Sequence, residues 1–171
     1  MALTKLLFQF SGGLAAIFLA GIGMLIVAQI VARLAGTQIP SADDFAAWSM
    51  AAGVFLALPS TFLSGGHIRV TLIFGAVSSP MRRVLDILST LFTLGLMAWA
   101  TWFVAEHVYE SYKYHEVSQG IIAVPLWIPQ LSMLFGMVLM LLAVFERFIA
   151  LLRGTDIIEP VTHSEAEEGS S

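Results

Sequence analysis

Cysteine is missing from this chain of 171 residues. Without a thiol, disulfide exchange, thiolate-bound metals and cysteine nucleophiles are excluded. Charged residues are also scarce, at 12% of the sequence, whereas a soluble domain carries roughly 25%. The basic residues form no stripe that nucleic acid could follow, and there is neither a Gly-rich nucleotide loop nor a nucleophile elbow. We therefore expect no enzyme, no cofactor and no nucleic-acid partner.

Hydrophobic residues make up 58% of the chain and gather in four stretches without a charged side chain. These stretches are Leu6–Ala32, Phe45–Leu63, Ile87–Ala105 and Val117–Phe145. Each is long enough to cross the hydrocarbon core, which takes about 20 apolar residues in a helix. The sequence therefore predicts an all-α membrane protein with one domain of four transmembrane helices, residues 1–153. The acidic remainder, residues 154–171, is expected to be a disordered cytoplasmic tail.

Lysine and arginine are distributed unevenly between the two ends of these stretches. One side carries Lys5, Arg69, Arg82, Arg83, Arg147 and Arg153, and the other carries Arg33 and Lys113. Because loops on the cytoplasmic side are enriched in lysine and arginine, we expect both termini in the cytoplasm. Residues 33–44 and 109–124 are then expected outside.

The segment Ser64–Gly75, between the second and third stretches, is too short and too polar to span the bilayer. It alternates like a strand, but an unpaired strand at a membrane surface would leave backbone groups unsatisfied. We therefore expect a short helix lying in the interface between the second and third transmembrane helices. Anionic lipid headgroups attract basic residues. The candidates for contact with them are His67, Arg69, Arg82 and Arg83.

Small residues recur every fourth position in the first two stretches. The candidate partner-interface residues are Gly12, Ala16 and Ala20 in the first stretch and Ser49, Gly53 and Ala57 in the second. Such faces let two helices approach closely in lipid. The pattern fits packing among the chain's own helices, docking against a second membrane protein, or both on different faces.

No ionisable residue lies near the centre of any stretch. Asp86, Glu106 and Glu146 all lie near helix ends, whereas transport and proton pathways normally need ionisable groups inside the membrane. A metal cluster on the outer side would have to be built from Glu106, His107, Glu110, His115 and Glu116. The spacing of these residues fits no strong ligand motif. We therefore expect no metal site and no self-sufficient ion-coupled transporter.

Several motifs, taken in order, resemble a known family. They are the acidic pair Asp43-Asp44, the run Gly65-Gly66-His67-Ile68-Arg69-Val70 with Leu72-Ile73 after it, the run Pro125-Leu126-Trp127-Ile128-Pro129-Gln130, then Gly136 and the pair Glu146-Arg147. This ordered set, over roughly residues 5–153, is similar to the small integral-membrane (Q-type, DctQ-like) subunit of tripartite ATP-independent periplasmic (TRAP) transporters. The chain departs from the family at Thr71, where an acidic residue is common.

The resemblance implies a three-part importer in a bacterial inner membrane. A periplasmic binding protein would capture an organic acid, and a large membrane subunit would move it with sodium by symport. The small subunit would act as a non-catalytic scaffold for the large one, with membrane lipids around both. The competing hypothesis is a stand-alone small transporter or channel built by oligomerisation. The sequence does not identify the transported substrate.

Overall fold

The computed structural model describes residues 2–63 and 79–154, and within these ranges the chain forms four α-helices. They are α1 (Ala2–Leu34), α2 (Ala42–Leu63), α4 (Ser79–Lys113) and α5 (Trp127–Arg153). All four are long and apolar enough to cross a membrane. The predicted four-helix membrane fold is confirmed. The predicted interfacial helix, with His67 and Arg69, and the tail from residue 155 onward lie outside the described residues.

Local chemistry explains where the helices end. Asp43 and Asp44 occupy the first turn of α2, where carboxylates interact favourably with the positive end of the helix dipole. Helix α5 ends at Gly154, whose φ of 74° is a left-handed conformation that glycine adopts without a side-chain clash. The Gly154 N–H donates to the carbonyl oxygens of Ala150 and Leu151, which caps two of the last free acceptors of the helix.

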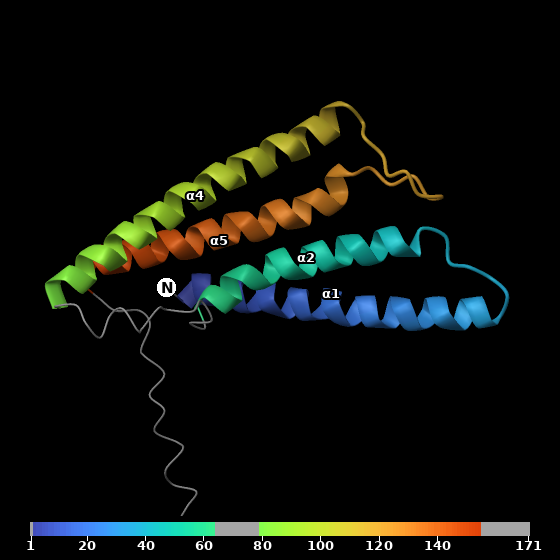
Figure 1. Ribbon diagram of the computed structural model, residues 1–171, viewed down its shortest axis with the longest axis horizontal. Helices are drawn as coiled ribbons and strands as arrows, with labels where there is room; N and C mark the ends of the chain where they lie inside the picture. The colour runs from blue at the N-terminus through green and yellow to red at the C-terminus, as the bar shows by residue number, and fades with distance from the viewer. Residues whose placement is uncertain (1, 64–78, 155–171) are drawn as a thin grey trace, which may run out of the picture.

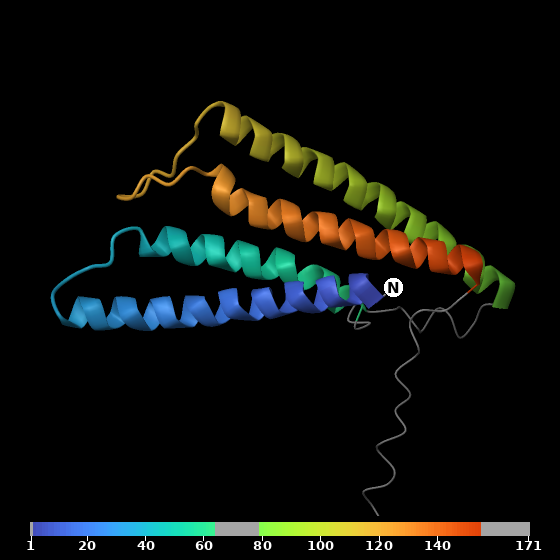
Figure 2. The same cartoon turned by 180° about the vertical axis from the view of Figure 1, so that it is seen from behind.

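The helices lie side by side in the spatial order α1, α2, α5, α4 (Figure 1), which the view from behind repeats (Figure 2). Extensive packing joins α1 to α2, α2 to α5, and α5 to α4. Helices α1 and α4 therefore form the two edges of the bundle, and α2 and α5 form its middle. Successive helices reverse direction, so that α2 and α5 run the same way.

The main core gathers residues from every helix. Its buried members are Phe8, Phe62, Leu139, Met140, Ala143 and Val144, with the partly buried Leu58, Leu94 and Met97 packed against them. A second, smaller cluster of Ala15, Ala52 and Leu56 joins α1 to α2. In lipid, helices gain little hydrophobic free energy by associating, so the close packing of these residues carries much of the attraction.

Pro59 lies inside α2 and is fully buried. Because proline has no N–H, it leaves the carbonyl oxygen of Phe55, four residues earlier, without its helical donor. A Cβ atom added at Gly136 would collide with this same carbonyl group. Helix α5 therefore approaches α2 closely at the Phe55 carbonyl, an arrangement that allows a weak Cα–H···O contact.

Candidate functional site

The small-residue pattern of α2 faces α1. Gly53 is buried, and a Cβ atom added to it would lie 3.2 Å from Leu19 Cγ and 3.5 Å from the carbonyl oxygen of Ala15. Ala57 packs against the smaller cluster and Ser49 is half-buried. Gly53 and Ala57 therefore belong to the contact between α1 and α2.

The pattern of α1 is divided between two sides of the helix. Gly12 faces α2, since a Cβ atom there would lie 3.1 Å from the Ser60 side chain. Ala16 and Ala20 are exposed, so they line an edge of the bundle that is open to a partner or to lipid. Their role in an intersubunit contact remains a prediction.

Two important packing residues were not among the predicted interface candidates. Ser11 is fully buried, and its hydroxyl donates a 2.6 Å hydrogen bond to the carbonyl oxygen of Leu56. Gly136 forms the close approach to Phe55. Ser11 precedes Gly12 in the first small-residue pattern and Gly136 belongs to the family-like motif of the fourth stretch, so the sequence carried a signal for each.

The loop that joins α1 to α2 contacts the loop that joins α4 to α5. The backbone N–H of Ile122, in the loop between α4 and α5, donates a 2.9 Å hydrogen bond to the Ser41 hydroxyl. A Cβ atom at Gly120 would collide with the Asp44 carboxylate and the Ser41 hydroxyl. Ser41 itself has a φ of 55°, an unusual conformation for a residue other than glycine. We name these contacts the outer clasp, because the distribution of lysine and arginine predicts that both loops lie outside.

The loop that reaches the outer clasp is internally well bonded. Ser118 hydroxyl donates to the carbonyl oxygen of Ile122 (3.0 Å) and accepts from the N–H of Val124 (3.1 Å). Ser111 hydroxyl donates to the Glu116 carboxylate at 2.7 Å, and Val117 forms an antiparallel bridge with Pro125. This pairing satisfies backbone groups that would otherwise be unpaired at the membrane surface.

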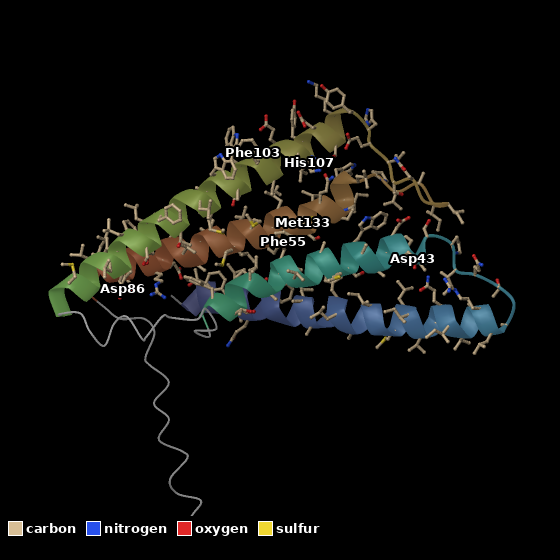
Figure 3. The ribbon with its side chains drawn as sticks, viewed as in Figure 1. Asp43, Phe55, Asp86, Phe103, His107 and Met133 are labelled. Atoms are coloured by element: carbon tan, nitrogen blue, oxygen red, sulfur yellow. The ribbon has the colours of Figure 1, made fainter. Side chains whose placement is uncertain are left out.

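Helices α4 and α5 are also joined near the loop that connects them. The rings of Tyr112 and Trp127 meet edge to face with centroids 5.8 Å apart. The Gln130 amide nitrogen lies 3.2 Å from His107 Nε2, on the side of α4 that faces α5 (Figure 3). Within the described part of the chain, no group of three or more histidines, cysteines or carboxylates could hold a metal ion.

At the opposite end, the Arg83 guanidinium donates to the carbonyl oxygen of Leu151 at 3.4 Å, which ties the start of α4 to the end of α5. A cation near the C-terminus of a helix also interacts favourably with its dipole. Arg147 lies over the Phe62 ring, 5.8 Å from its centroid. Arg83 is exposed, so it remains a candidate for headgroup contact, while nothing is described of the Arg82 side chain.

Comparison with known families agrees with the resemblance seen in the sequence motifs. The family described as "Tripartite ATP-independent periplasmic transporters, DctQ component" matches residues 22–154. The match covers α2, α4 and α5 completely and the C-terminal part of α1. No curated protein matches the chain. A DctQ protein is a component of a tripartite transporter and not an enzyme, which accords with a bundle of four spanning helices in an inner membrane. The chain belongs to the DctQ family of small TRAP transporter subunits.

Proposed function

We propose that the chain is a non-catalytic scaffold for the large, sodium-coupled permease subunit of a TRAP importer. In this proposal the imported compound is an organic acid that a periplasmic binding protein delivers. The proposal rests on the kinds of residue in the parts of the helices that would lie inside the membrane. The charged residues of α4 lie toward its two ends, with none between Asp86 and Glu106, and the apolar part of α1 between Lys5 and Arg33 has no charged residue. A secondary transporter normally needs ionisable groups or broken helices at mid-membrane depth.

The packing inside the bundle supports a bracing role. Gly53 and Ser11 fix α1 to α2, Gly136 fixes α2 to α5, and the Tyr112–Trp127 ring contact joins α4 to α5. The outer clasp adds a fixed connection between the two outer loops. A chain held at so many points suits a static support better than it suits a moving carrier.

The partners and the orientation belong to the same proposal. With both termini in the cytoplasm, the outer clasp would face the periplasm and the binding protein, and Arg83 would face the cytoplasmic leaflet. The exposed edges at α1 and α4 leave room for the large subunit. Ala16 and Ala20 would allow a partner helix to approach the α1 edge closely.

Reconstitution tests the scaffold proposal. The purified chain in liposomes, with an inward sodium gradient and a panel of organic acids, is expected to show no saturable uptake. The same liposomes with the large subunit and the binding protein added serve as the positive control. Saturable uptake by the chain alone would instead support a stand-alone oligomeric transporter or channel and would refute the scaffold.

A further inference from the structure

The outward face of α4 carries four large aromatic side chains. Phe92, Trp99, Trp102 and Phe103 are all exposed, with Trp99 at 62% and Trp102 at 70% of their full accessible area. The rings of Trp99 and Phe103 lie against each other with centroids 4.9 Å apart. We name these four residues, together with Gly95 between them, the aromatic face of α4. A Cβ atom at Gly95 would meet nothing within 4 Å, so the space over the Gly95 backbone is open.

The depth of Trp99 is unusual. The part of α4 without a charged residue runs from Ile87 to Ala105, which at about 1.5 Å per residue nearly fills a hydrocarbon core about 30 Å thick. Trp99 lies three residues from the middle of this part and roughly 10 Å below the level of Glu106. Trp102 lies about one helical turn from Glu106, near the interface where tryptophan is normally enriched. Of the two indoles, that of Trp99 therefore lies well inside the core.

Lipid tails are a poor neighbour for an indole at this depth. The indole N–H is a hydrogen-bond donor that usually finds an acceptor when it leaves water. Acyl chains offer none, and the carbonyl groups of α4 are used by its own helical bonds. By contrast, the exposed side of α5 is aliphatic apart from its phenylalanines, which lack polar atoms. Its exposed large residues are Ile128, Leu131, Phe135, Val138, Leu142, Phe145 and Leu152. That side is well suited to lipid, and the aromatic face is not.

Charge continues the aromatic face toward the outer boundary. Glu106 and Glu110 follow Trp102 and Phe103 by about one and two helical turns, and both are exposed. The nearest cation along the helix, Lys113, lies over the Tyr114 ring at 5.4 Å. A surface complementary to this face would therefore offer hydrogen-bond acceptors at mid-depth and a lysine or arginine near the outer boundary.

We propose that the aromatic face of α4, extended by Glu106 and Glu110, is where the large membrane subunit packs a transmembrane helix against this chain. The partner helix would place a hydrogen-bond acceptor opposite Trp99, a bulky side chain against the Gly95 backbone, and a basic residue opposite the two glutamates. This inference rests on the proposed scaffold function and deepens it by assigning the interface to the α4 edge of the bundle.

Site-specific photocrosslinking in native membranes tests the assignment. A benzoylphenylalanine is placed at Trp99 or Trp102, and, as matched controls, at Leu131 or Val138 on the exposed side of α5 and at Ala16 on α1. We expect a crosslinked product with the large subunit from the two α4 positions, at least fivefold above the controls. Crosslinking that is strongest from α1 or α5, or equal from all positions, would overturn the assignment.

A second measurement separates this inference from the scaffold proposal. The W99L/W102L variant is expected to reduce co-purification of the large subunit at least fivefold, while the melting temperature of the isolated chain stays unchanged because both side chains are exposed. The F135L variant on α5 should co-purify normally. Normal co-purification of the double variant would overturn the inference alone. Failure of the unmodified chain to co-purify with the large subunit would overturn the scaffold proposal, and the inference with it.

Discussion

The hydroxyl of Ser11 on α1 donates a 2.6 Å hydrogen bond to the carbonyl oxygen of Leu56 on α2, at a point where Ser11 is fully buried. The acceptor lies three residues before Pro59, whose ring disturbs the regular bonding of the preceding helical turn. In α2 the disturbed turn is therefore contacted from both sides, by Ser11 of α1 and by Gly136 of α5. Pro59 does not end α2, because neighbouring helices supply contacts to the carbonyl groups around it.

Replacing Ser11 by alanine should destabilise the bundle modestly. The substitution removes the donor and leaves the Leu56 carbonyl without this partner, and interhelical hydrogen bonds in membranes contribute about 0.6–2 kcal/mol. We expect a lower midpoint in reversible denaturant unfolding of the detergent-solubilised chain. The matched control is Ser89→Ala, because Ser89 is exposed and bonds only within its own helix, to the carbonyl oxygen of Asp86. Equal midpoints for the two variants would contradict the role assigned to Ser11.

Substitution by alanine should affect stability differently at Gly136 and at Gly95, although both glycines lie in apolar helices. At Gly136 a Cβ atom would collide with the Phe55 backbone, which cannot rotate away as a side chain can. Overpacking of this kind costs about 1–3 kcal/mol, and the Gly136→Ala variant should melt earlier in detergent. At Gly95 the added Cβ atom meets nothing within 4 Å, so Gly95→Ala should melt no earlier than the unmodified chain. If the Gly95 variant were destabilised and the Gly136 variant were not, the packing assigned to the two glycines would be wrong.

The outer clasp predicts a third sensitive glycine. A Cβ atom at Gly120 would collide with the Asp44 carboxylate and the Ser41 hydroxyl, so Gly120→Ala should break the contact between the two outer loops. The loop would then lose the Ile122–Ser41 hydrogen bond, and its amides should exchange with deuterium faster than in the unmodified chain. Gly23, on α1 with nothing within 4 Å, provides the alanine control. Unchanged exchange at residues 117–125 would show that the clasp tolerates the substitution.

The sequence predicted the helices better than it predicted their neighbours. The uncharged stretches were sufficient for four spans, because a bilayer requires long apolar helices whatever their packing. The helix limits differ from the limits of the stretches. The third stretch begins at Ile87, whereas α4 begins at Ser79, and the fourth begins at Val117, whereas α5 begins at Trp127.

The packing partners of each helix were harder to predict, since a small-residue pattern indicates only that another helix can approach closely, and not which helix it is. Gly53 and Ala16 look alike in sequence, yet Gly53 is buried against α1 while Ala16 is exposed. The outer clasp could not be predicted because Ser41 and Ile122 are separated by two spans in sequence, and no pattern pairs a hydroxyl with a distant backbone N–H. The aromatic face of α4 was hidden for a related reason, because the sequence does not show which side of a spanning helix its neighbours leave exposed.

The orientation predicted from lysine and arginine can be tested directly, because the chain has no cysteine of its own. Gln119 is exposed in the outer loop, and Ser79 begins α4 at the opposite end. A cysteine at Gln119 should react with an impermeant thiol reagent added to spheroplasts, and a cysteine at Ser79 should react only after the membrane is permeabilised. If only the Ser79 variant were labelled from outside, the topology would be the reverse of the predicted one.

Leucine at Gly53 and at Ala16 should separate internal packing from an intersubunit role. At Gly53 a larger side chain would hold α1 and α2 apart, since the site already lies 3.2 Å from Leu19 for a Cβ atom alone. Loss of the close dispersion contacts should lower the melting temperature or abolish accumulation of the chain. At Ala16, which is exposed, leucine should leave the fold intact.

Co-purification of the Ala16→Leu variant with the large subunit then decides between the two edges of the bundle. If the variant folds and retains the large subunit, the α4 edge alone accounts for the contact. If it folds and loses the large subunit, the α1 edge also belongs to the interface, as the small-residue pattern predicted. Instability of the isolated Ala16→Leu chain would contradict its exposed position, because a residue that faces lipid has room for the three added carbon atoms.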